Sequence, residues 1–146
     1  NSGGVRDSIA PGDITYKDVL TVQPFGNMVS YVDMTGKEVL DYLNVVATKP
    51  VDSGAYAQFA GIAMSINNGE VTNVFIGNKQ LRLDGNYRFT VPSYNAAGGD
   101  GYPKIDDHPG YVNTGFTDAE VLKDYLETHS PVDVNAYAPS GEIVYK

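Results

Sequence analysis

The chain has 146 residues, 42% of them apolar and 19% charged, and carries a net charge of −8 at pH 7. This composition is typical of one globular domain, and the acidic balance disfavours nucleic-acid binding because phosphate groups repel a negative surface. No apolar run approaches the roughly 18 residues needed to cross a bilayer, and the absence of cysteine excludes disulfides, thiolate zinc ligands and a cysteine nucleophile.

Helical and strand signals follow one another in the first third of the chain. A short helical segment is expected over residues 16–20, and MVSYVD at residues 28–33 has strand composition. Thr35 and Glu38 form a capping box, in which each side chain bonds the backbone amide of the other residue. Apolar residues at helical spacing follow them, which predicts a helix over residues 36–47.

The middle of the chain alternates short β-like runs with turns. Asn68-Gly69 is a strong signal for a hairpin turn. Strands are expected over residues 63–66, 71–76, 80–83 and 87–92.

The last third begins with a glycine-rich loop and ends in a short strand. Residues 103–113 are expected to continue as loop, and Thr117 and Glu120 form a second capping box before a helix that Ser130-Pro131 ends. A final strand is expected over residues 142–145. Helices mixed with mostly antiparallel strands indicate an α+β fold.

The opening NSGGVR places a flexible glycine pair beside Arg6. Backbone N–H groups and a guanidinium in such an arrangement can bind an anion. The alternative is an ordinary glycine-rich turn with a solvated arginine. The Lys-Ser/Thr tail of a P-loop is missing.

Phe25 and Asn27 lie in a second turn, PFGN. The ring can offer a flat face to a planar ligand while the amide contacts its edge. The alternative is that Phe25 is buried in the core at a loop. A third pattern places Tyr94 shortly before Asp100 in YNAAGGDG. There an aromatic ring and a carboxylate can bind a base and a polar edge or ribose hydroxyl, or Asp100 can simply cap local amides.

Nothing in the chain predicts a hydrolytic centre. His129 is expected at a helix C-terminus, where the helix dipole favours a cation. Asp106, Asp107 and His108 are adjacent in sequence, and adjacent residues seldom converge on one metal ion. The nucleophile motif G-x-S-x-G is absent.

Together the segments NSGGVRDSI, VQPFGN and SYNAAGGDGY, in this order and spacing, resemble the C-terminal domain of the 5′-nucleotidase family, above all its bacterial periplasmic or surface enzymes that hydrolyse UDP-sugars and 5′-nucleotides. The resemblance covers essentially the whole chain. It implies a layered α/β sandwich with mixed, mostly antiparallel sheets.

The resemblance also implies roles for individual residues. Phe25 and Tyr94 match two rings that stack on the base, although the family often has Phe at the second position. Asp100 matches the residue that binds the ribose hydroxyls, and Arg6 a substrate-phosphate arginine. Asn1 matches a polar contact near that arginine, and Asn27 matches a contact with the edge of the base. Gly54 lies where the family's loop comes close to the base or ribose.

The resemblance places catalysis outside this chain. It implies that residues 1–146 form one substrate-binding domain, lacking the family domain's first helix and strand. An N-terminal metallophosphatase domain of the same chain would hold two divalent metal ions, and the substrate-binding domain would rotate to bring a nucleotide or nucleoside to them. The fragment alone is expected to be inactive, without a cofactor or a metal site, and the parent to be periplasmic or on the bacterial surface. The alternatives are a stand-alone binding or interaction module, or a family sibling that acts on 2′,3′-cyclic nucleotides.

Overall fold

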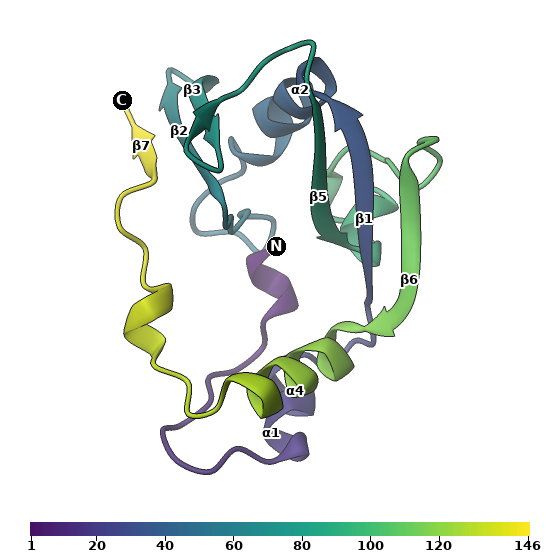
Figure 1. Ribbon diagram of the computed structural model, residues 1–146, viewed down its shortest axis with the longest axis vertical. Helices are drawn as coiled ribbons and strands as arrows, with labels where there is room; N and C mark the ends of the chain where they lie inside the picture. Colours follow the sequence, from purple (N-terminus) through teal and green to yellow (C-terminus); the bar gives the residue numbers. More distant parts are fainter.

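The computed structural model describes all residues, 1–146, and contains two β-sheets with helices between and below them (Figure 1). The α-helices are α1 (Tyr16–Val22), α2 (Gly36–Val46), α3 (Ser93–Ala96) and α4 (Asp118–His129). Three short 3₁₀ helices are η1 (Ser2–Gly4), η2 (Gly99–Gly101) and η3 (Val134–Tyr137).

The first sheet has three antiparallel strands in the order β5-β1-β6. Its strands are β1 (Met28–Thr35), β5 (Asn86–Pro92) and β6 (Tyr111–Thr117). The second sheet has four strands in the order β4-β3-β2-β7, and only β7 runs parallel to its neighbour. Its strands are β2 (Ile62–Asn67), β3 (Glu70–Ile76), β4 (Lys79–Gln80) and β7 (Ile143–Tyr145). The fold is therefore α+β with mixed, mostly antiparallel sheets, as the sequence predicts.

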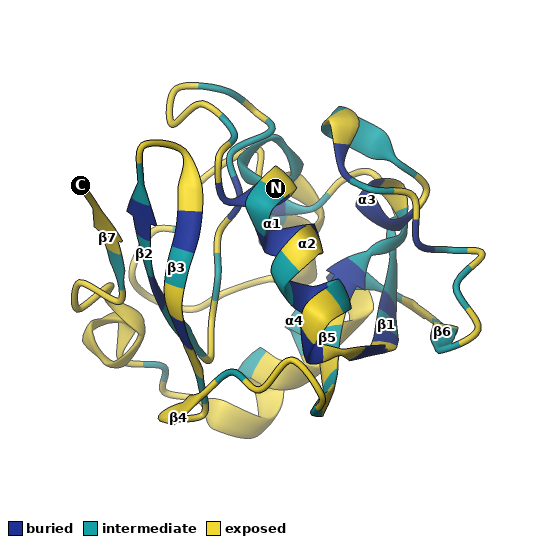
Figure 2. Ribbon diagram, turned by 90° about the horizontal axis from the view of Figure 1, so that it is seen from above, coloured by how far each residue is buried: buried dark blue, intermediate teal, exposed yellow.

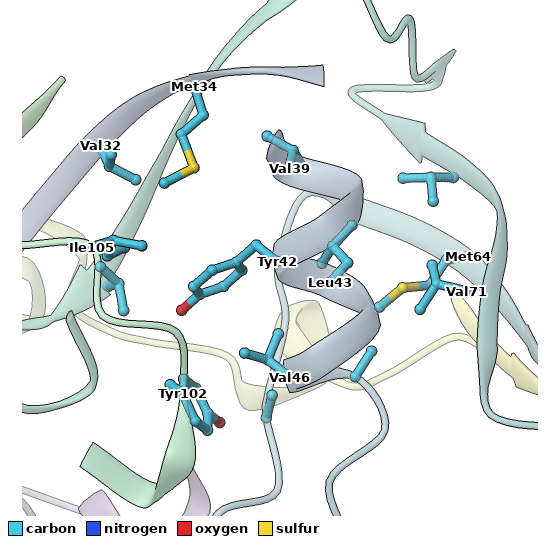
Figure 3. Packing of buried hydrophobic residues seen from close by; sticks show 14 of the residues in the cluster. Val32, Met34, Val39, Tyr42, Leu43, Val46, Met64, Val71, Tyr102 and Ile105 are labelled. Carbon is cyan, nitrogen blue, oxygen red and sulfur yellow. The ribbon is translucent and has the colours of Figure 1, made fainter. Parts of the chain in front are cut away.

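Helix α2 lies between the two sheets and carries apolar side chains toward both. Figure 3 shows Leu43 facing Met64 and Val71 of the second sheet, whereas Tyr42 faces the β1 side, near Ile105. Burying side chains of this size stabilises a fold by about 1.5–3 kcal/mol each. Because one helix fills the space between both sheets, it fixes how the sheets sit relative to each other.

The start of α2 is set by local chemistry. The side chain of Thr35 accepts from the backbone N–H of Glu38, and Glu38 accepts from the backbone N–H of Thr35, which completes the predicted capping box. A Cβ at Gly36 would collide with the carbonyl of Arg82, so only glycine fits at this position. The observed helix agrees with the predicted range 36–47 to within one residue.

Helices α1 and α4 pack against each other at the far end of the molecule from α2 (Figure 1). Both begin with a capping box, Thr15–Asp18 in α1 and Thr117–Glu120 in α4. Figure 2 shows that α4 and the chain after it are mostly exposed, whereas α2, β1, β2 and β3 carry buried residues. None of the helices is both long and apolar enough to span a bilayer.

Two strand predictions are wrong in detail. The sequence predicts a loop over residues 111–113, yet these residues begin β6. They form a strand because their backbone groups pair with β1, and their side chains show no strand pattern that would have revealed this. Gly115, within β6, has a φ of +77°, a left-handed conformation that is unusual for a strand residue. The strand expected over residues 80–83 is only Lys79–Gln80, although the N–H of Leu81 still donates to the carbonyl of Val74 in β3 at 2.8 Å. The hairpin at Asn68-Gly69 joins β2 to β3, as predicted.

Candidate functional site

The start of the chain meets the glycine-rich loop after α3 through one side-chain contact. Asn1 Nδ2 donates a hydrogen bond to Asp100 Oδ2 at 2.6 Å. Next to it, the backbone N–H of Gly3 donates to the carbonyl of Gly54 at 2.8 Å, and a Cβ on Gly3 would lie only 3.2 Å from Gly54. The close approach of the two glycines thus brings Asn1, Gly54 and Asp100 to one place.

Backbone conformations that favour glycine or aspartate shape the loop that carries Asp100. Gly98 has a φ of +100°, and Asp100 is left-handed with φ 60° and ψ 19°. Short polar residues such as Asp tolerate this conformation, which larger L-residues avoid. A Cβ on Gly99 would lie 2.6 Å from the ring of Tyr94, so the loop and the ring are in tight contact. Tyr94 OH then donates to Asp100 Oδ1 at 3.1 Å.

Three further side chains hold this loop in place. Asn95, fully buried, donates from Nδ2 to the carbonyl of Gly99 at 3.3 Å. Lys49 Nζ donates to the carbonyl of Gly101 at 3.0 Å, and Tyr102 OH donates to the carbonyl of Ala55 at 2.7 Å. Burial, with the nearby charge of Asp100, raises the pKa of Tyr102 to about 12. Tyr102 therefore stays protonated near neutral pH and keeps donating to the loop beside Gly54.

Phe25 lies in an exposed turn. Phe25 is 59% exposed, which contradicts the alternative of a buried core residue. Gly26 has a φ of +65°, so the turn uses the left-handed freedom of glycine. The guanidinium carbon of Arg6 lies 5.8 Å from the centre of the Phe25 ring, within the range of a cation–π contact. The backbone N–H of Arg6 is also fixed, donating to the carbonyl of Val22 at 2.9 Å.

Two hydrogen bonds, one to a side chain and one to a backbone carbonyl, link the Phe25 turn to the rest of the fold. The N–H of Met28 donates to Ser93 Oγ at 3.0 Å, and Ser93 directly precedes Tyr94. Asn27 is half-buried, and its carbonyl accepts from the N–H of Asp118 at 2.8 Å. The Phe25 turn is therefore anchored both to α4 and to the start of the segment that carries Tyr94.

The predicted residues fall into two linked groups. Asn1, Tyr94 and Asp100 share hydrogen bonds, and Gly54 joins them through Gly3. Arg6 and Phe25 form the second group, with Asn27 on the same turn as Phe25. The carboxylate of Asp100 accepts from two side chains rather than from backbone amides, so the alternative that it caps its own loop is wrong.

Sequence reasoning missed the residues that support the glycine-rich loop. Asn95 lies within the motif YNAAGGDG, but its complete burial became visible only in the fold. Lys49 and Tyr102 gave no signal, because their hydrogen bonds to carbonyls join segments about fifty residues apart.

The two histidines have structural contacts. His108 Nδ1 accepts from the N–H of Gly110, so Nε2 carries the proton and donates to Glu38 Oε2 at 2.6 Å. The hydrogen bonds from the Thr35 backbone and from His108 hold the pKa of Glu38 below its ordinary value. His129 is the last residue of α4 and stacks on Tyr125.

No three His, Asp or Glu side chains of the chain come close enough together to hold a metal ion. What the two groups offer chemically is recognition, through exposed aromatic faces, a carboxylate acceptor and a guanidinium.

Comparison with known proteins gives consistent matches. A family model described as "5'-nucleotidase, C-terminal domain" matches residues 1–107. The chain is 87% identical over its whole length to a "5'-nucleotidase" of Vibrio parahaemolyticus, of which it covers 26%, and 53% identical to "Protein UshA" of Escherichia coli, of which it also covers 26%. The chain thus spans about a quarter of the length of these curated relatives.

A solved structure shares the fold. The 5′-nucleotidase precursor of Thermus thermophilus superposes with a TM-score of 0.83 at 32% identity, covering 98% of this chain and 30% of that chain. The similarity therefore includes the elements that position both groups of candidate residues, from η1 to the glycine-rich loop.

Proposed function

The chain belongs to the family of 5′-nucleotidase C-terminal domains, and from this membership we propose that it is the nucleoside-recognition domain of a metal-dependent enzyme that hydrolyses 5′-nucleotides and UDP-sugars. The hydrolytic metals would belong to an N-terminal metallophosphatase domain of the same chain, because this chain spans only about a quarter of the length of its 5′-nucleotidase relatives. The parent would act in the periplasm or on the bacterial surface.

The base binds between the rings of Phe25 and Tyr94. The two residues are 59% and 47% exposed, so a ligand can reach both from solvent. Stacking of one base on an aromatic side chain contributes about 1–3 kcal/mol and tolerates any base, because every base has a π face. This arrangement favours purine and pyrimidine nucleotides alike. Asn27, on the same turn as Phe25, contacts the edge of the base.

The ribose binds at Asp100. When ionised, its carboxylate carries no proton and can only accept hydrogen bonds, which ribose hydroxyls can donate. Asn1 holds one carboxylate oxygen, and Gly54 lies beside the same point through Gly3. A Cβ at position 54 would lie 3.4 Å from Gly3 Cα, so the glycine lets the start of the chain approach this loop closely, next to Asp100.

Arg6 binds the phosphate group of the nucleotide. Its guanidinium is exposed and lies at the Phe25 end of the site. A guanidinium can form two parallel hydrogen bonds to a phosphate group. By orienting the scissile group toward metals held elsewhere, Arg6 would contribute positioning rather than chemistry to phosphoryl transfer.

One observation carries the proposal: the carboxylate of Asp100 is fixed directly beside the exposed ring of Tyr94, on a loop whose glycines admit no larger residue. The test is steady-state hydrolysis of AMP by the full-length protein with added divalent metal. Asp100→Ala should raise KM at least tenfold, because a charged hydrogen-bond acceptor contributes about 1.5–3 kcal/mol. Asp84→Ala is the matched control, since Asp84 pairs with Arg82 on an exposed loop between β4 and β5. Equal KM values for the two variants would contradict the proposal.

A further inference from the structure

Two protein donors hold the carboxylate of Asp100, one on each oxygen. Tyr94 OH contacts Oδ1 at 3.1 Å, and Asn1 Nδ2 contacts Oδ2 at 2.6 Å. A terminal carboxylate torsion is otherwise broad, so a single anchor would leave the carboxylate free to turn. With one anchor on each oxygen, the plane of the group is set.

The direction of the Tyr94 anchor is itself fixed. The Tyr94 ring stands against Gly99, where a Cβ would come within 2.6 Å of ring atoms Cε1 and Cζ. The phenol has one proton, and that proton is used in the bond to Asp100. The hydroxyl of Tyr94 therefore has no proton left to donate to a ligand, and its bond instead orients the Asp100 carboxylate.

The anchored carboxylate keeps one acceptor site on each oxygen. An ionised carboxylate offers about four lone-pair sites, two on each oxygen. The bonds from Tyr94 and Asn1 occupy one site on each. A vicinal diol carries two adjacent O–H donors, which match the two sites that remain on a carboxylate whose plane is fixed.

On this geometry we propose that the Tyr94 hydroxyl is a positioning group that makes the site selective for sugars with a free 2′,3′-diol. The inference rests on the proposed function, because it requires Asp100 to bind the sugar. Tyr94 would then have two separable roles, with its ring serving the base and its hydroxyl serving the ribose through Asp100.

The test compares AMP with 2′-deoxyadenosine 5′-monophosphate in the full-length protein. Tyr94→Phe keeps the ring and removes only the hydroxyl, so KM for AMP should rise about three- to tenfold, as expected for one hydrogen bond. KM for the deoxynucleotide should change less than twofold, and kcat for both should stay within twofold. Tyr137→Phe is the matched control, because the Tyr137 hydroxyl also makes a side-chain hydrogen bond, to Tyr125, but Tyr137 lies in η3 rather than among the candidate residues. It should change neither KM.

A double-mutant cycle separates this positioning role from a general effect on folding. In an Asp100→Asn background, adding Tyr94→Phe should not raise KM for AMP further, because the hydroxyl acts only through the carboxylate. Additive effects in the cycle would overturn the inference, and so would an unchanged or equally raised KM for both substrates in Tyr94→Phe.

Failure of the proposed function would look different. Tyr94→Leu removes the ring as well, and it should raise KM for both substrates. If Tyr94→Leu and Tyr94→Phe both leave every KM unchanged, nucleoside binding at this site is itself wrong. If only Tyr94→Leu has an effect, the stacking proposal is supported and the inference about the hydroxyl is overturned.

Discussion

The two aromatic residues proposed to enclose the base differ in how firmly the fold holds them. Tyr94 is in tight contact with Gly99 and bonds Asp100, and buried Asn95 supports the same loop. Phe25 projects from a turn at 59% exposure, and the guanidinium of Arg6 lies 5.8 Å from the centre of its ring. One face of the site is thus built before a ligand arrives, whereas the other is free to adjust to it.

This difference indicates how the site divides its tasks. A preorganised group binds without first losing conformational entropy, so the Tyr94–Asp100 side is suited to the invariant ribose. An exposed ring on a turn can shift to fit bases of different size. Selectivity is therefore expected to reside on the Tyr94 side and tolerance on the Phe25 side.

The largest effect is expected when each ring is removed. Tyr94→Leu and Phe25→Leu each lose a stacking contact of about 1–3 kcal/mol, which raises KM for AMP about 5- to 150-fold. Tyr94→Leu should have the larger effect, because it also releases Asp100. Steady-state kinetics of the full-length variants will measure both, and a larger effect for Phe25→Leu would reverse the assignment of the fixed side.

The two glycines that shape the turns offer the next comparison. A methyl group at position 99 would lie 2.6 Å from the carbonyl oxygen and ring of Tyr94, whereas nothing lies within 4 Å of one at position 26. Gly99→Ala should therefore lose about 1–3 kcal/mol of unfolding free energy through overpacking, and raise KM for AMP about tenfold.

Gly26→Ala is the matched control for that prediction. It should lose only the cost of a left-handed alanine, about 1–2 kcal/mol, with KM changing about twofold or less. Urea unfolding and AMP hydrolysis report the two quantities separately. A higher KM for AMP in Gly26→Ala than in Gly99→Ala would contradict the idea that the Tyr94–Asp100 side is fixed before the ligand binds.

A smaller effect is expected at Arg6. Its contact with the Phe25 ring is exposed, and such cation–π contacts contribute about 0.5–1 kcal/mol. Arg6→Gln should raise KM for AMP more than it raises the inhibition constant of adenosine, because adenosine has no phosphate. Equal changes in KM for AMP and in the inhibition constant of adenosine would show that Arg6 acts only through its contact with the Phe25 ring.

The smallest effect is a shift in acid stability, and it concerns the loop that follows Tyr94. His108 in this loop bonds Glu38, whose pKa is lowered first by the Thr35 backbone N–H and then by His108. A lowered folded-state pKa stabilises the fold above the ordinary glutamate pKa of 4.5, and this contribution is lost as pH falls through the lowered value.

Glu38→Gln should therefore flatten the fall of the urea midpoint below pH 4.5. Its midpoint at pH 7 should be lower than that of the wild type, because the charged cap is gone. Asp41→Asn is the control, since Asp41 lies on the same helix and forms only an exposed ion pair with Lys37. An acid limb as steep as that of the wild type in Glu38→Gln would contradict this account.

The sequence predicted what depends on local signals. The range of α2 followed from Thr35, Glu38 and apolar spacing, and the hairpin followed from Asn68-Gly69. Strand β6 was missed because its Asn, Thr and Gly residues form a strand only when β1 is beside them.

The same limit applies to the site. The candidate residues, apart from Gly54, came from three motifs, and the loops that carry them lie in contact. The bond from Asn1 to Asp100 joins residues 99 positions apart, so no local pattern predicts it. The support given by Asn95 depends on its complete burial, which only the packed loop defines.

The most direct test of the central claim is adenosine binding to the full-length protein after its metals are removed with a chelator. Without metals or a phosphate group, affinity depends on base and ribose contacts alone. We expect the wild type to bind adenosine. The Phe25→Leu/Tyr94→Leu double variant, with a melting temperature within a few degrees of the wild type, should bind it at least tenfold more weakly, because two stacking contacts are lost. Equal affinity in the two proteins would show that the nucleoside binds elsewhere.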